Sequence, residues 1–92
     1  MATTIEHNTA EQRYEIFLDG QLAGYAEYAD RNGVRNFNHT LTLPQFRGHG
    51  VAAQVVEHAL TDTRNAGLKV IPSCWYVDEF IARNREFADL VG

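Results

Sequence analysis

The chain has 92 residues, a formal net charge of −4 at pH 7, 45% hydrophobic residues and one cysteine. This length allows one domain, and the balance of apolar and charged residues is typical of a globular protein. The negative charge argues against a nucleic-acid partner, which normally requires a basic face. A single cysteine excludes an internal disulfide, and a cysteine-based zinc site would lack its other ligands.

The four histidines, His7, His39, His49 and His58, do not have the spacing of a metal site, so we expect no bound metal. The sequence shows no secretory signal and no apolar run long enough to cross a membrane. We therefore expect a cytoplasmic protein with no membrane partner.

The first twelve residues are polar and show no hydrophobic period, which predicts a flexible N-terminus over 1–12 and a single domain over 13–92. Alternating patterns then predict strands over 13–18, 22–28 and 34–43. Asp19-Gly20 and Asn32-Gly33 separate them, and such pairs are typical of tight hairpin turns. The first half therefore reads as an antiparallel meander. In its third strand, alternation places Phe37, His39, Leu41 and Leu43 on one face.

The hydrophobic period changes after Gly50 from two to about 3.6, which predicts an amphipathic helix over 50–66 that ends at Gly67. Its expected buried stripe consists of Val51, Ala52, Val55, Val56, Ala59, Leu60 and Thr63. A short strand over 68–71 follows, stopped by Pro72, and it should lie parallel to the third strand because a helical crossover joins them. One or two short helices over 75–91 complete the chain.

The expected fold class is therefore α/β (α+β). It combines a mixed sheet, made of a three-strand antiparallel meander and one parallel strand, with a central amphipathic helix and C-terminal helices.

Two glycines, Gly48 and Gly50, stand between the third strand and the amphipathic helix. Glycine permits close approach of the backbone to a ligand, and the free amides at a helix N-terminus favour an anion. Arg47 adds a positive charge at the rim. The segment is thus a candidate phosphate or pyrophosphate site. The alternative is that the glycines form only a tight turn and a helix cap.

Two phosphate-binding motifs fit this segment poorly. A P-loop requires a lysine after its glycines, and none is present. The spacing Gly48-x-Gly50-x-x-Ala53 matches the dinucleotide fingerprint. However, residues 44–47 separate the first glycine from the strand, and Ser73 rather than an acidic residue follows the next strand.

A third pattern fits better. The segment Gln45-Phe46-Arg47-Gly48-His49-Gly50 matches the Q/R-x-x-G-x-G/A signature of the GNAT superfamily of N-acetyltransferases. His39-Thr40 precedes it, Pro72-Ser73-Cys74-Trp75-Tyr76 follows the next strand, and Asp89-Leu90-Val91 ends the chain. With these motifs in this order, the chain from about Tyr14 onward resembles a very small GNAT-like family. The resemblance implies a minimal GNAT-like fold.

The resemblance also implies acetyl-CoA as cofactor. In such folds the pantetheine pairs with the open backbone of the strand before the signature, and the pyrophosphate lies on the amides that follow. The acetyl group then points between the third and fourth strands. Carried over to this sequence, the cofactor-binding residues are Leu41, Thr42, Leu43, Arg47, Gly48, His49, Gly50, Val51 and Ala52.

Two side chains are candidate catalytic residues. Cys74 comes just after the fourth strand, where the thioester should arrive, so its thiol is placed to accept or contact the acetyl group. The alternative is a buried, inert cysteine. His39 lies in the strand beside the expected cleft, and histidine is the commonest general base. The alternative is a histidine packed in the core.

We therefore expect an N-acetyltransferase that moves an acetyl group from acetyl-CoA to an unidentified primary amine, on a small molecule or a peptide. The alternative is a CoA- or acetyl-CoA-binding module with little or no turnover. A purely structural role for the glycines is the third hypothesis. For the oligomeric state we expect a monomer or a weak dimer.

Overall fold

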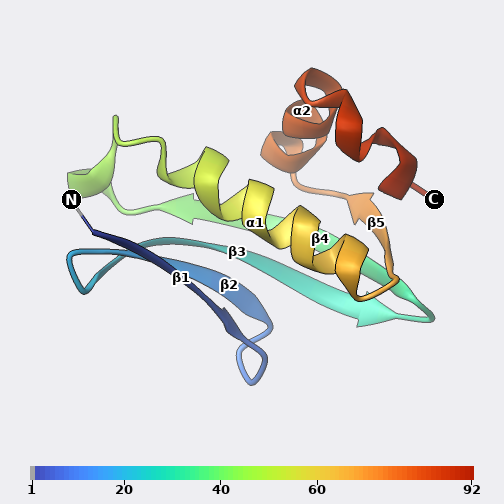
Figure 1. Cartoon of the computed structure of the whole chain (residues 1–92), viewed down its shortest axis with the longest axis horizontal. Coiled ribbons are helices and arrows are strands. Elements are labelled where there is room, and N and C mark those ends of the chain that lie inside the picture. The colour runs from blue at the N-terminus through green and yellow to red at the C-terminus, as the bar shows by residue number, and fades with distance from the viewer. Residues whose placement is uncertain (1) are drawn as a thin grey trace.

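The computed structural model describes residues 2–92 and shows a five-stranded sheet with helix α1 lying across one face (Figure 1). The elements are β1 (Thr3–Asn8), β2 (Arg13–Leu18), β3 (Gln21–Arg31), β4 (Val34–Thr42), the 3₁₀ turn η1 (Pro44–Phe46), α1 (Val51–Asn65), β5 (Lys69–Pro72), α2 (Trp75–Arg83) and the 3₁₀ segment η2 (Arg85–Leu90). The strands stand in the order β1-β2-β3-β4-β5, with β4 and β5 parallel and the other pairs antiparallel. The expected mixed sheet, helical crossover and C-terminal helices are confirmed.

Both predicted hairpin turns are present. Asp19 and Gly20 have φ values of 50° and 80°, and Asn32 and Gly33 have 52° and 79°. Two successive residues at positive φ make the turn that matches the right-handed twist of paired strands. Asp and Asn tolerate this conformation better than other residues with a side chain, and glycine adopts it without strain.

The prediction of a flexible N-terminus over 1–12 is wrong for the residues of β1, while Met1 lies outside the described residues. β1 forms a regular antiparallel ladder with β2, from Thr3 opposite Leu18 to Asn8 opposite Arg13. Ile5 packs against the core from this strand. The segment is too polar to show a clear period, so only its pairing with a strand already bound into the sheet identifies it as a strand.

The prediction that Phe37 and His39 share a face of the sheet is also wrong. Tyr28 stands opposite Phe37, but its neighbour Glu27 stands opposite His39, so Asn38 is an extra residue in β4. This β-bulge reverses the alternation beyond it, because one inserted residue turns every later side chain to the other face. Phe37 is buried beneath α1, whereas His39 is exposed.

Helix α1 confirms the predicted amphipathic pattern at six of its seven positions. Its buried side chains are Val51, Val55, Val56, Ala59, Leu60 and Thr63, whereas Ala52, predicted in the same stripe, is only half-buried at the open end of the helix. They pack on β2, β3 and β4, and α2 adds Val77 and Ile81 to the same core. At the end of α1, Gly67 has φ 75°, and the amides of Gly67 and Leu68 donate to the carbonyls of Arg64 and Thr63. This is the glycine-terminated helix end that the sequence predicted.

A half-buried polar cluster ties β1 to the rest of the fold. The His7 ring stacks on Tyr14 with centroids 4.1 Å apart, and its Nε2 atom lies 2.5 Å from the Tyr28 hydroxyl. Its Nδ1 atom lies 3.4 Å from an Asp62 carboxylate oxygen of α1. Burial and the nearby Arg35 charge lower the pKa of His7 from its ordinary value, against the opposing pull of Asp62. The folded protein therefore holds the neutral imidazole more readily than the unfolded chain does.

We expect the free energy of unfolding to decrease as the pH falls below about 6.5, the ordinary pKa of histidine. A lowered pKa in the folded state means that the unfolded chain takes up the proton first, so acid favours unfolding, whereas stability is unaffected above this range. Urea unfolding between about pH 5.5 and 8 measures the slope. His7→Phe, which keeps an aromatic ring beside Tyr14, should flatten it, and His49→Gln in the exposed loop should not. Equal slopes in wild type and His7→Phe would contradict the assignment.

Candidate functional site

Strands β4 and β5 are paired over only part of their length. Their pairing runs from Val34 opposite Lys69 to Phe37 opposite Pro72, and the Cys74 amide makes a last bond of 2.8 Å to the Phe37 carbonyl. β4 then continues to Thr42, while the other chain turns away into α2. The second half of β4 is therefore open on the side that β5 has left.

The open edge of β4 presents backbone groups of two threonines. Leu43 donates its amide to the Ala23 carbonyl of β3, and backbone groups alternate in direction along a strand. The backbone groups of Leu41 and Leu43 therefore face β3. Those of Thr40 and Thr42 face the gap that opens beside β4 where β5 ends and the chain turns into α2. Of the three strand residues predicted to bind the cofactor, only Thr42 directs its backbone into the gap. Thr40 was missed, because the bulge that orients it leaves no mark in the hydrophobic pattern.

The N-terminus of α1 lies at the end of this strand and has no side-chain cap. Gly48 and Gly50 adopt φ values of 87° and 67°, and Gly50 is the N-cap residue. Within residues 2–92, no backbone or side-chain acceptor is bonded to the amides of Val51, Ala52 and Ala53, and the first bond of the helix runs from the Gln54 amide to the Gly50 carbonyl. Gln54 donates to the carbonyls of His49 and Gly50 and so holds the loop in place. The arrangement leaves a cluster of free amides, with exposed Arg47 beside it.

A glycine that sequence reasoning missed sets the position of this helix end. A Cβ atom on Gly24 would lie 2.5 Å from the Leu41 carbonyl oxygen and 2.8 Å from Cγ1 of Val51. Only glycine therefore lets the first turn of α1 approach β3 and β4 this closely. The signal was present in the sequence, because a glycine inside an alternating strand pattern often marks close backbone approach.

Cys74 lies at the mouth of the gap as the N-cap residue of α2. Its Sγ atom is 3.5 Å from the Thr40 hydroxyl. Burial raises the pKa of the Cys74 thiol, but contacts with the Thr40 hydroxyl and with the amides of Val77, Tyr76 and Thr40 outweigh burial and leave the pKa below its ordinary value. The Cys74 side chain is half-buried and not fully enclosed in the core. A lowered pKa favours the thiolate, which is the nucleophilic form.

His39 lies on the same strand as Thr40 but on the opposite face. Its ring is 6.2 Å from that of Tyr25, and Glu27 stands opposite it in β3. Because His39 is exposed, the alternative of a histidine packed in the core is wrong. Its imidazole is open to solvent on the face of the sheet that α1 does not cover.

A mixed sheet whose two parallel strands separate beside an uncapped, glycine-containing helix N-terminus defines the GNAT class of folds. The model of the GCN5-related N-acetyl-transferase family matches residues 13–90, and the chain belongs to this family.

The chain is similar to proteins of known sequence or structure over most of its length. It is 25% identical over 83 residues to Protein NATD1 of Xenopus tropicalis, which covers 87% of this chain and 75% of that protein. The solution structure of a GCN5-like protein from Staphylococcus aureus has a TM-score of 0.74 at 20% identity, covering 97% of this chain and 87% of the other. A GNAT acetyltransferase from Brucella melitensis, crystallised with acetyl-CoA, has a TM-score of 0.59 at 19% identity, covering 74% and 50%.

Within residues 2–92, no helix has the length and apolar character needed to cross a bilayer. The same part of the chain contains no cluster of three or more metal-binding side chains.

Proposed function

We propose that this protein transfers an acetyl group from acetyl-CoA to a primary amine on a small molecule or a peptide. The observation that carries the proposal is the position of the Cys74 thiol, whose pKa is lowered, beside the Thr40 hydroxyl at the open edge of β4. Membership of the GCN5-related N-acetyltransferase family supports the same reaction.

The residues present fit acetyl-CoA at both ends of the gap. Free amides at the start of α1 match the two negative charges of a pyrophosphate. A Cβ atom on Gly48 would meet no atom within 4 Å, so space is open directly beside the backbone there. The outward backbone of Thr40 and Thr42 offers the amide groups of pantetheine a strand edge to pair with. Bound there, acetyl-CoA supplies a thioester as the acetyl source.

Cys74 is proposed to accept the acetyl group before the amine does. The amides at the start of α2 and the Thr40 hydroxyl stabilise the thiolate. Its sulfur attacks the thioester carbonyl, a new carbon–sulfur bond forms, and coenzyme A leaves as a thiolate that takes up a proton. The amine nitrogen then attacks the acetyl-Cys74 carbonyl, loses a proton and regenerates the Cys74 thiolate.

His39 is proposed as the group that takes the proton from the amine. It is exposed on β4, on the face of the sheet opposite the Thr40 side chain, so the proposal requires the amine to reach acetyl-Cys74 from that face, between β4 and α2. The Glu27 position opposite His39 carries a negative charge that favours a cationic substrate on this face. A His39→Phe variant should then keep acetyl-CoA affinity but lose turnover.

A binding module with little turnover remains the second candidate function. Only four residues, 9–12, connect β1 to β2. No helix lies between these two strands that could form one side of a binding site for the acceptor amine. Release of free coenzyme A in the presence and absence of amines separates the two functions. Release of many equivalents of coenzyme A per chain only when an amine is present supports the transferase. Release of no more than one equivalent per chain with any amine supports the binding module.

The covalent route predicts that wild-type protein incubated with acetyl-CoA alone gains the mass of one acetyl group. Cys74→Ala and Cys74→Ser should gain none, and their turnover with an amine should fall by roughly a hundredfold or more, because the nucleophile is lost. Intact mass spectrometry and a thiol-release assay measure the two effects. Full turnover in Cys74→Ala, without acetylated wild type, would show direct transfer to the amine and reduce Cys74 to a lining residue.

A further inference from the structure

Strand β1 leaves one edge of the sheet with unpaired backbone groups. Asp19 donates its amide to the Ala2 carbonyl, so Ala2 and Asp19 face each other as a hydrogen-bonded pair. Such pairs alternate along an antiparallel ladder, so the even-numbered residues of β1 bond to β2. The amides and carbonyls of Thr3, Ile5 and His7 therefore point outward.

The two edge strands of the sheet differ in whether they are blocked against pairing with another strand. At the far edge β5 has only four residues, ends in Pro72, and has its Val70 bridged by Val91 from the C-terminal segment. β1 has six residues, TTIEHN, with no proline or lysine, and its ladder with β2 contains no bulge. Natural sheets normally block a free edge with such devices, because an open strand pairs with another chain. β1 therefore has an unblocked edge with which a further strand can pair.

We propose that two copies of this chain pair through β1 in an antiparallel register centred on Ile5, joining their sheets into one. The outward groups of Thr3, Ile5 and His7 then bond to those of His7, Ile5 and Thr3 in the second copy. Ile5 meets its own equivalent and Thr4 stands opposite Glu6. Shifting the two-fold axis by one residue, to Glu6, would place like charges directly opposite each other, which is destabilising. The register on Ile5 avoids this and pairs more of the strand than the one centred on Thr4.

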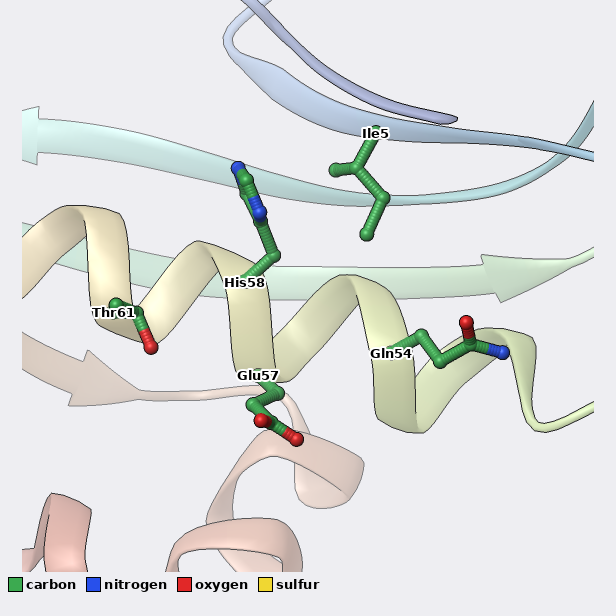
Figure 2. Close-up of a pocket in the computed structure, with 5 residues that line it drawn as sticks. All are labelled: Ile5, Gln54, Glu57, His58 and Thr61. Atoms are coloured by element: carbon green, nitrogen blue, oxygen red, sulfur yellow. The ribbon is translucent and has the colours of Figure 1, made fainter. Parts of the chain in front are cut away.

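A cavity of about 350 Å³ runs beside the same edge and favours this partner. Figure 2 shows Ile5 reaching from β1 toward α1 and His58 rising from α1 toward the strands. Gln54, Glu57 and Thr61 complete the lining. Because Ile5 belongs to the edge strand, a paired second copy would supply the missing wall.

Sedimentation equilibrium of the full chain, from micromolar to millimolar concentration, tests the proposal. Wild type should move reversibly from its monomer mass of 10.4 kDa to twice that value. Thr4 is exposed, so its side chain can be changed without altering the core. Thr4→Glu places a carboxylate opposite Glu6 of the second copy at two symmetric positions and should weaken the dimer by about five- to tenfold. Thr4→Gln, similar in size but neutral, should leave the dissociation constant within about twofold of wild type.

Amide hydrogen exchange locates the contact independently of these variants. The outward amide of Ile5 should exchange more slowly at millimolar than at micromolar concentration, while the inward amide of Glu6 should be protected at both. A monomer at every concentration would overturn the proposal. So would a dimer that Thr4→Glu leaves unchanged and in which the Ile5 amide gains no protection, because the contact would then lie on another surface.

Discussion

Acetyl-CoA at about 100 times its dissociation constant should stabilise the wild-type chain by roughly 2.7 kcal/mol, because it binds only the folded state. In a domain of this size that corresponds to a rise in melting temperature on the order of ten degrees. Gly48→Val should abolish the rise. Gly48 has no neighbour within 4 Å of where its Cβ would stand, so an added isopropyl group would occupy the space proposed for the pyrophosphate. Differential scanning fluorimetry over a range of ligand concentrations measures the effect.

Gly67→Val at the opposite end of α1 is the matched control. Gly48 and Gly67 have φ values of 87° and 75°, and neither has an atom within 4 Å of an added Cβ. A side chain at positive φ costs about 1–2 kcal/mol in either position, so both variants should melt below wild type. Only Gly67→Val should keep the acetyl-CoA shift. The proposed binding site would be wrong if the Gly48→Val variant kept it too, or if millimolar acetyl-CoA left wild type unchanged.

Replacing Arg35 by alanine should lower the free energy of unfolding by about 3 kcal/mol, because it breaks a largely buried polar network. The residue is 7% exposed. Its guanidinium donates two bonds of 2.8 Å to the Asp30 carboxylate and one of 2.7 Å to the Tyr14 hydroxyl, and it lies 4.1 Å from the centre of the Tyr28 ring. These partners lie on β2 and β3 and Arg35 lies on β4, so the loss affects three neighbouring strands of the sheet. Urea unfolding measures the change.

Arg31→Ala provides the control for Arg35→Ala. Arg31 ends β3 close to the same hairpin but is exposed, so its loss should change stability by less than about 0.5 kcal/mol. Arg35→Lys keeps the positive charge but loses the two-pronged contact to Asp30. Its free energy of unfolding should therefore lie between those of Arg35→Ala and Arg31→Ala. Similar stabilities for Arg35→Ala and Arg31→Ala would show that the network contributes little.

Most of the strand and helix pattern could be predicted from the sequence, because its signals act over a few residues. Asp19-Gly20 and Asn32-Gly33 specify their turns through local backbone sterics. The buried stripe of α1 follows from a period that any single helix must obey. The parallel pairing of β4 with β5 followed from the handedness and length of a helical crossover.

The candidate site was predicted only in part. The glycines before α1 and the thiol after β5 are visible as residue types at a given spacing, so the sequence indicates Gly48, Gly50 and Cys74 as candidates. The contact of Cys74 with Thr40 joins residues 34 positions apart, and no local pattern encodes it. Gly24 was overlooked because its role is to leave room for Val51 of α1, which is far from it in the sequence.

By itself the sequence determined where the turns, the helices and the glycine-containing loop lie, since dihedral preferences and hydrophobic periods are properties of short segments. Only the tertiary structure decided that residues 3–8 form an edge strand, that the bulge at Asn38 turns His39 away from the core, and that Thr40 meets Cys74. Each of these depends on pairing between segments distant in the chain. The free energy of such pairing comes from partners that no short window of sequence contains.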